Sequence, residues 1–279
     1  MHSKIDAVTL SADGLRYPWD SHPGIDQVLE VAPGILWVRL DLPFRLNHVN
    51  IYLIADGDGY AMVDTGIGNE ATIAAWTALF DGALKGKNIT RVIVTHAHPD
   101  HLGFARMASD IWNVPIWAHP DERPLARHPY RYAHERSRLI SPIAHPASIP
   151  VLATLIEAGA LRVRPVTTLH LFSPGETLDV PGRPTVLHTP GHTAGHCALY
   201  FAGRDTVISG DALVTFDPHT GKEGPQIISG AATANTGRAL LSLGILASTD
   251  AGIMLPGHGH AWRDGIGHAA ALARQASGL

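Results

Sequence analysis

Thr95-His96-Ala97-His98-Pro99-Asp100-His101 is the stretch of this chain that carries the most structural information. It follows the run Arg91-Val92-Ile93-Val94, whose β-branched apolar residues predict a buried strand. Three imidazoles and one carboxylate therefore stand where a strand ends. Imidazole and carboxylate together suit a borderline cation such as Zn²⁺, so the stretch predicts a metal site at the edge of a sheet.

The spacing of these donors divides them into two pairs. Side chains alternate along an extended segment, so His96 and His98 point the same way and can share one metal. Pro99 bends the chain, which directs Asp100 and His101 toward a second metal beside the first. The alternative is a polar loop with clustered histidines, in a chain that contains 18 of them. A metal site requires further ligands downstream, whereas a polar loop does not.

Further donors do follow, each just past a strand-like run. They are His192 after Thr185-Val186-Leu187, Asp211 after Asp205-Thr206-Val207-Ile208, and His258 after Gly252-Ile253-Met254. A glycine stands beside each donor, and glycine lets the backbone turn tightly and approach a metal closely. A polar loop does not explain donors at four strand ends, so the metal site is the better interpretation.

Five motifs in a fixed order carry a resemblance to a known family. They are Val63-Asp64-Thr65-Gly66, His96-Ala97-His98-Pro99-Asp100-His101, Pro190-Gly191-His192-Thr193, Gly210-Asp211 and Gly257-His258. With them, roughly residues 30–275 resemble the metallo-β-lactamase fold superfamily. The resemblance implies an α/β fold, an αββα sandwich of two mixed β-sheets with helices on both outer faces.

The resemblance also implies a set of ligands for two divalent metal ions. One metal would be held by His96, His98 and His192, and the other by Asp100, His101 and His258, with Asp211 bridging the two. Asp64 matches a family carboxylate that orients a ligand. His196 could face the same pocket, but the family does not usually count it as a ligand, so we expect a supporting or structural role. Zn²⁺ is the expected ion, and Mn²⁺, Fe²⁺ and Co²⁺ suit similar sites.

Length and composition indicate one soluble globular domain over residues 1–279. Apolar residues make up 45% of the chain, the formal net charge is -4 and the isoelectric point is about 6.5. Such a balance gives no electrostatic footprint for nucleic acid. The N-terminus has no apolar run of signal-peptide length, and no stretch approaches a membrane span. The single cysteine, Cys197, has no partner for an internal disulfide, so we expect a cytoplasmic protein without membrane contact.

Apolar periodicity predicts alternating strands and helices without an internal linker. The expected strands are Ile35–Leu40, Val49–Ile54 and Ala61–Val63, the last two joined by a turn at Asp56-Gly57-Asp58-Gly59. The expected helices are Glu70–Leu84, Leu102–Trp112, Asn235–Ala247 and Gly267–Gln275.

A long insertion at about residues 119–169 departs from a minimal version of this fold. Its prolines divide it, and Ile149–Ala160 is apolar enough to form a helix. We expect two helices with a loop, lying over the mouth of the site as a lid that shapes substrate choice. A dimerisation arm is the alternative, so a homodimer is possible. The short segment Thr215–Gly221 contains Asp217 and His219 and is expected to form a simple turn, the alternative being that these two residues line the pocket wall.

The expected ligands define the expected chemistry. Two adjacent divalent metals lower the pKa of a water from about 16 to near 7, which yields a metal-bridging hydroxide as nucleophile. One metal polarises the carbonyl and stabilises the oxyanion. Asp100 accepts a hydrogen bond from the hydroxide, and it then moves the proton to the leaving group as the catalytic residue. The expected partner is a small-molecule substrate.

Several subclasses of the superfamily can be compared with these residues. Exported β-lactamases tend to lack the acid that is Asp211 here, and redox di-iron members typically carry Glu where His98 stands. Glyoxalase II-like thioesterases and quorum-signal lactonases share the full ligand set. We therefore expect a dinuclear hydrolase of a small ester, lactone or thioester. The alternatives are a mononuclear iron oxidoreductase like the persulfide dioxygenases, β-lactam hydrolysis as a main or side activity, and a non-catalytic binding protein that retains the metal site.

Overall fold

Two β-sheets stacked face to face form the middle layers of the molecule. The computed structural model describes residues 9–10, 16–17, 22–24, 26–43, 47–129, 131, 148–157 and 163–278. Within these residues the larger sheet has seven strands in the order β3-β4-β5-β6-β7-β8-β9. Its strands are β3 (Leu29–Ala32), β4 (Ile35–Asp41), β5 (His48–Asp56), β6 (Gly59–Val63), β7 (Ile89–Ile93), β8 (Ile116–Ala118) and β9 (His170–Leu171). The pairing is antiparallel from β3 to β6 and parallel from β6 to β9.

The second sheet has the order β10-β11-β12-β15. Its strands are β10 (Thr185–His188), β11 (Cys197–Phe201), β12 (Thr206–Gly210) and β15 (Ile253–Pro256). The first two pairings are antiparallel and the last is parallel, so this sheet is mixed like the first. Two small antiparallel pairs complete the set, β1 (Thr9–Leu10) with β2 (Arg16–Tyr17) and β13 (Val214–Phe216) with β14 (Glu223–Gln226).

Alternating side chains explain how the sheets pack. In β4, Ile35 and Trp37 point into the cluster between the two sheets, whereas Val38 packs on the opposite face. Ile208 of β12 and Leu255 of β15 meet that cluster from the second sheet. Because both faces of β4 are buried, the run Ile35–Val38 is continuously apolar, and the strand becomes polar only at Arg39 and Asp41 near its end.

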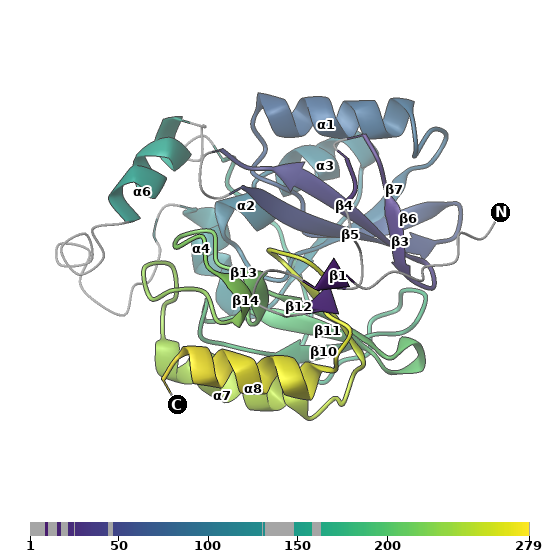
Figure 1. The fold of residues 1–279 in the computed structure, drawn as a ribbon. Coiled ribbons are helices and arrows are strands. Elements are labelled where there is room, and N and C mark those ends of the chain that lie inside the picture. The colour runs from purple at the N-terminus through teal and green to yellow at the C-terminus, as the bar shows by residue number, and fades with distance from the viewer. Residues whose placement is uncertain are drawn as a thin grey trace.

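Helices cover both outer faces of the sandwich (Figure 1). On the larger sheet lie α1 (Glu70–Asp81) and α3 (Ala105–Trp112), and on the smaller sheet lie α7 (Thr236–Ala247) and α8 (Ile266–Ala276). Caps fix two helix starts, since the side chains of Asn69 and Asn235 accept backbone N–H groups of the first turns of α1 and α7. The predicted αββα sandwich is confirmed.

The predicted elements are correct in kind, and the differences lie at their ends. The three predicted strands fall within β4, β5 and β6. The first helix ends at Asp81 rather than Leu84, because the backbone of Gly82 leaves the helical conformation and caps it. A single helix over Leu102–Trp112 is wrong. The chain forms α2 (Pro99–Leu102) and then α3, because the backbone N–H of Phe104 bonds the carbonyl oxygen of Gly66 at 3.0 Å instead of continuing the helical pattern.

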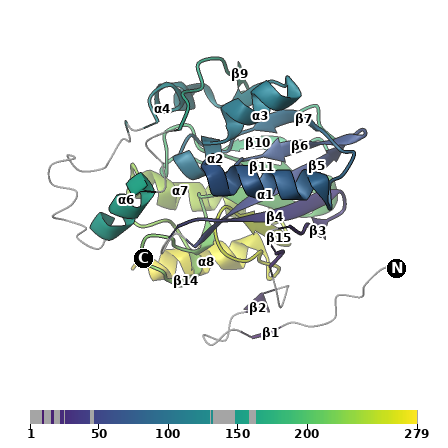
Figure 2. The ribbon, with the colours of Figure 1, turned by 90° about the horizontal axis from the view of Figure 1, so that it is seen from above.

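The insertion contains three short helical elements within the described residues. They are η2 (Pro120–Glu122), α4 (Arg123–Arg127) and α6 (Ser148–Glu157). The helix predicted for Ile149–Ala160 is confirmed as far as Glu157. Residues 130, 132–147 and 158–162 of the predicted lid lie outside the described part of the chain. Both views place α6 on the side of the molecule that carries α2 (Figures 1 and 2). None of the described helices has both the length and the apolar character that a membrane span requires.

Asn50 of β5 joins the two sheets. Its side-chain amide donates to the carbonyl oxygens of Pro256 at 2.9 Å and Gly259 at 2.8 Å, and its Oδ1 accepts from Nε1 of Trp37 at 2.9 Å. Tyr52 adds a hydroxyl bond to the same Pro256 oxygen at 2.8 Å. These buried bonds hold the turn after β15 against the larger sheet.

Replacing Asn50 with alanine should therefore destabilise the fold. Asn50→Ala removes three buried bonds and leaves polar groups without their partner, which should cost about 3 kcal/mol of unfolding free energy. Tyr52→Phe is the matched control, because it removes one bond and should cost about 1 kcal/mol. Urea unfolding measures both, and equal losses in the two variants would contradict this assignment.

Candidate metal centre

The predicted ligands lie in four loops that follow strands of both sheets. His96 and His98 come after β7, and α2 then carries Asp100 and His101. His192 follows β10, Asp211 follows β12 directly, and His258 follows β15. The structure brings all seven of these residues together, in three overlapping groups whose donor atoms lie within 4.8 Å of one another. These groups are His96, His98 and His192; His96, His101 and Asp211; and Asp100, His101 and His258.

Asp211 is at the middle of this constellation. Its Oδ2 lies 3.4 Å from the Nε2 atoms of His101, His192 and His258, and 3.9 Å from Nε2 of His96. Oδ2 of Asp100 also lies 3.4 Å from Nε2 of His258. Both groups of donors thus meet at one carboxylate, which is the arrangement that a bridging ligand requires.

Several donor atoms in this centre have no hydrogen-bond partner. Within the described residues, Nε2 of His96, His101 and His192 and Oδ1 of Asp211 are buried and make no hydrogen bond. A buried polar atom without a hydrogen-bond partner costs about 1–3 kcal/mol of folding free energy. Four such atoms close together therefore indicate a ligand-binding site. Imidazole nitrogens and carboxylate oxygens are ligands of Zn²⁺ and related divalent cations, so the donor set fits metal ions.

Hydrogen bonds on the outer side of the imidazoles orient them. Nδ1 of His101 lies 2.8 Å from Oδ2 of Asp64, and Nδ1 of His258 donates to the carbonyl oxygen of His48 at 2.7 Å. Each bond fixes the proton on Nδ1 and leaves the Nε2 lone pair facing the centre. Asp64 also accepts from the backbone and hydroxyl of Thr95, both at 2.8 Å, so it joins the loop after β6 to the loop after β7.

His196 supports the centre from behind. Its Nε2 accepts the backbone N–H of Asp211 at 3.0 Å, and its Nδ1 lies 2.8 Å from the hydroxyl of Thr189. Because both ring nitrogens are engaged in these bonds, the ring holds the Asp211 backbone instead of facing the donor atoms. The sequence left its role open between support and structure, and the structure shows a positioning contact.

Glu122 is a supporting residue that the sequence analysis did not identify. This buried carboxylate accepts the backbone N–H of Ala97 at 2.7 Å on Oε2, and on Oε1 it accepts the N–H of Gly195 at 2.7 Å and the hydroxyl of Thr193 at 2.6 Å. It thereby joins the loop of His96 and His98 to the loop of His192. The signal was an acid just after the strand Ile116–Ala118, at the same sheet edge.

Two glycines allow the loops to approach this closely. A Cβ atom on Gly257 would meet Oδ1 of Asp211, and a Cβ atom on Gly191, whose φ is 140°, would meet the backbone of Ala239. Both glycines stand directly before a predicted ligand. Their lack of a side chain is therefore required for the donors to converge.

The electrostatics of the cluster favour neutral imidazole and ionised carboxylate at several positions. Burial lowers the pKa of His96 and His192 well below the usual value, and neighbouring histidines lower it further. Burial opposes ionisation of Asp211, yet His258 and His101 hold its pKa well below the ordinary value. Burial also opposes protonation of His258, but Asp211 and Asp100 raise its pKa to about 10. Metal ions and protons therefore compete for His258.

The turn predicted for Thr215–Gly221 is found at Asp217–Gly221, since Thr215 and Phe216 belong to β13. Oδ1 of Asp217 accepts the backbone N–H of His219 at 2.9 Å, and Oδ2 accepts the hydroxyl of Thr220 at 2.9 Å. The N–H of Gly221 bonds the Asp217 carbonyl at 2.7 Å and closes the turn. Asp217 therefore has a structural function in the β13–β14 connection.

A fourth group that could hold a metal lies apart from the centre and contains His119, Asp121 and His188. The rings of His119 and His188 stack with centroids 4.5 Å apart and planes 11° apart. Imidazole lone pairs lie in the ring plane, so those of two parallel stacked rings do not converge on one ion. Nε2 of His188 also donates to the carbonyl oxygen of Ala194 at 3.0 Å. We assign no metal to this group.

Comparison with known proteins agrees with the geometry. Residues 45–258 match the metallo-beta-lactamase superfamily. The chain belongs to this superfamily. The protein named "Probable metallo-hydrolase YybB" of Bacillus subtilis (strain 168) is 29% identical over 178 residues, which are 63% of this chain and 67% of that protein.

Solved structures of the superfamily share this fold. A beta-lactamase domain protein from Burkholderia ambifaria has 26% identity and a TM-score of 0.71, over 94% of this chain and 80% of that chain. TTHA1623 in a di-iron-bound form has 25% identity and a TM-score of 0.55, over 81% of this chain and 94% of that chain. The family and these relatives support a metal-dependent hydrolase.

Glu122→Gln should loosen the centre without touching a donor atom. In the wild type the carboxylate accepts hydrogen bonds from two N–H groups and one hydroxyl. The variant places an amide N–H₂ group against one of these donors, so the loop of His96 and His98 should separate from the loop of His192. We expect a loss of metal affinity of about 10-fold to 100-fold, measured by competition with a chromophoric chelator. Asp121→Asn, on the exposed neighbour, is the control and should leave the affinity unchanged. A Glu122→Gln protein with unaltered affinity would show that the link between the loops is dispensable.

Proposed function

We propose that this protein is a dinuclear metal-dependent hydrolase of a small ester, lactone or thioester. The observation that carries the proposal is the convergence of both donor groups on Oδ2 of Asp211, with inward-facing nitrogens that make no hydrogen bond. His96, His98 and His192 would hold one ion, and Asp100, His101 and His258 the other, with Asp211 shared. Zn²⁺ is the ion that suits these donors best, and Mn²⁺, Fe²⁺ or Co²⁺ also fit.

The residues of the centre have distinct tasks in such a reaction. Two divalent ions, when bound, supply a water of lowered pKa and polarise the electrophilic carbonyl. We assign proton transfer to Asp100, whose side chain is 17% exposed, whereas that of Asp211 is 3% exposed. Its carboxylate is held ionised because, against the effect of burial, His101 and His258 lower its pKa. It can accept the proton of the attacking water and deliver it to the leaving group.

The identity of the bound metal and that of the substrate can both be tested directly. A relative whose structure is described as a di-iron-bound form supports iron as a competing occupant. The substrate panel therefore includes a lactone, a thioester, a carboxylate ester, a β-lactam and a persulfide. A small-molecule substrate is favoured over nucleic acid because the chain carries a net charge of -4.

Metal content tests the dinuclear assignment. We expect two equivalents of zinc or a similar divalent ion per chain, measured by elemental analysis on protein purified without chelator and without a histidine tag. Hydrolysis of one ester, lactone or thioester should disappear with the metal and return when it is restored. One equivalent of iron, with oxygen-dependent turnover of the persulfide, would instead indicate a mononuclear oxidoreductase.

Two variants separate binding from chemistry. His96→Ala should lose metal and activity together, since His96 contributes to two of the donor groups. Asp100→Asn keeps an oxygen donor but removes the proton acceptor, so it should lower kcat by about 100-fold or more while retaining most of the metal. Substrate binding and turnover that stay unchanged in both variants would contradict the enzyme and indicate a binding protein.

A further inference from the structure

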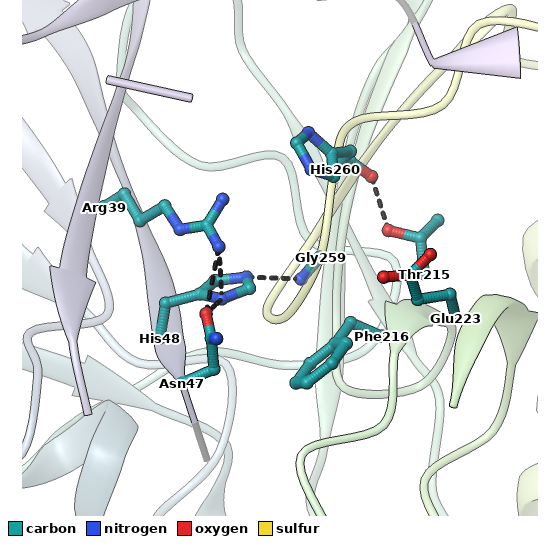
Figure 3. A pocket seen from close by; sticks show the side chains of 8 residues that line it. All are labelled: Arg39, Asn47, His48, Thr215, Phe216, Glu223, Gly259 and His260. Carbon is teal, nitrogen blue, oxygen red and sulfur yellow. Dashed lines mark hydrogen bonds between the residues drawn. The ribbon is translucent and has the colours of Figure 1, made fainter. Parts of the chain in front are cut away.

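A cavity of about 190 Å³ lies behind the loop that carries His258 (Figure 3). It is lined by residues of three segments, Arg39, Asn47 and His48 from the β4–β5 hairpin, Thr215, Phe216 and Glu223 from the β13–β14 hairpin, and Gly259 and His260. No role in the proposed chemistry uses it. Its most unusual feature is the guanidinium of Arg39.

Arg39 carries a buried charge whose partners are too few. The residue is 9% exposed, and both of its short polar contacts come from Nη2. Nη1 is buried and makes no hydrogen bond within the described residues. Burial lowers the pKa of Arg39 to about 10 although Asp41 raises it, so the side chain remains charged near neutral pH.

The tautomer of His48 leaves Arg39 with a single acceptor. The backbone N–H of Gly259 donates to Nε2 of His48 at 2.7 Å, so the proton of the neutral ring is on Nδ1. Nδ1 then donates to Oδ1 of Asn47 at 2.7 Å, and it has no lone pair for Nη2 of Arg39, which lies 2.6 Å away. Among the described residues, the guanidinium therefore has one hydrogen-bond acceptor, Oδ1 of Asn47, which lies 3.1 Å from Nη2.

Removing a charge from water without a counter-ion costs several kcal/mol, so such groups are usually paired or bind a ligand. Figure 3 shows the second terminal nitrogen of Arg39 pointing away from Asn47 and His48 and toward the side where His260 lies. Glu223 also lines the cavity, but its side chain is exposed, where solvent screens its charge. The cavity therefore presents one buried positive charge with an unused donor.

We propose that this cavity binds a carboxylate group of a small molecule through Arg39. A guanidinium fork matches a carboxylate in shape and charge, and the volume suits a group of a few heavy atoms. The carboxylate belongs either to the substrate itself or to a separate small acid. A separate acid would affect the metal centre through His48. The ring of His48 accepts the N–H of Gly259, and its carbonyl oxygen accepts from Nδ1 of His258. Only the substrate source rests on the proposed hydrolase function.

Calorimetry on the metal-loaded protein tests the binding with butyrate as the probe and butyramide as its neutral match. We expect butyrate to bind, butyramide not to bind, and Arg39→Met to weaken butyrate at least tenfold with its metal content intact. Arg106→Met removes an exposed arginine of α3 and is the control. Equal butyrate affinity in Arg39→Met would mean that the acid binds the metals alone, and it would overturn the proposal, as would an absence of butyrate binding.

Thermal unfolding separates a ligand site from a structural arginine. Without butyrate, Arg39→Met should melt no lower than the wild type, because it removes a charge whose burial is unfavourable and which Asp41 offsets only in part. Butyrate should raise the Tm of the wild type and leave that of Arg39→Met unchanged. Arg39→Lys keeps the charge without the fork, so it should fold as the wild type and bind butyrate more weakly. A large loss of Tm in both variants would assign Arg39 a structural role and overturn the proposal.

Kinetics with paired substrates distinguish the two sources. If the carboxylate belongs to the substrate, Arg39→Met should lower kcat/KM at least tenfold for an ester that also carries a free carboxylate. For the matched neutral ester, in which an amide replaces that carboxylate, kcat/KM should not change. If it belongs to a separate acid, butyrate should change turnover of the neutral ester without competing with it, and Arg39→Met should abolish that effect. Binding that depends on Arg39 in a protein that hydrolyses no substrate would overturn the hydrolase and keep the carboxylate site.

Discussion

The convergence of imidazole nitrogens on the Asp211 carboxylate is the constraint on which the rest of this structure depends. Four loops from two sheets must bring their donors within a few ångströms of one buried oxygen, and several of those donors face inward without hydrogen bonds. Such an arrangement is costly without a bound cation. The energy that metal ions return is therefore part of the stability of this edge of the sandwich.

Buried polar residues outside the centre hold the loops in place. Asp64 joins the loop after β6 to that after β7, and Glu122 joins the loops after β7 and β10. His196 holds the backbone of Asp211, and Asn50 holds the turn after β15. Each interaction crosses between segments that are distant in sequence, so the donor geometry is a property of the whole sandwich.

The sequence predicted the parts of the site that depend on local pattern. Donors that follow apolar strands meet where the strands end, so the grouping of His96 and His98 with His192, and of Asp100 and His101 with His258, could be expected. The role of Glu122 depends on a contact with Gly195, 73 residues away, which no spacing reveals. In the sequence, Arg39 likewise looks like an ordinary polar residue of a strand. Its burial follows from the packing of the hairpins around it, which the sequence pattern does not show. Whether the insertion acts as a lid stays a prediction.

Anomalous diffraction from crystals of the metal-loaded protein, collected at the absorption edge of the bound metal, tests the central claim most directly. The account predicts two peaks on opposite sides of the Asp211 carboxylate, one among His96, His98 and His192 and the other among Asp100, His101 and His258. A single fully occupied peak, with the second group of donors left free, would contradict it.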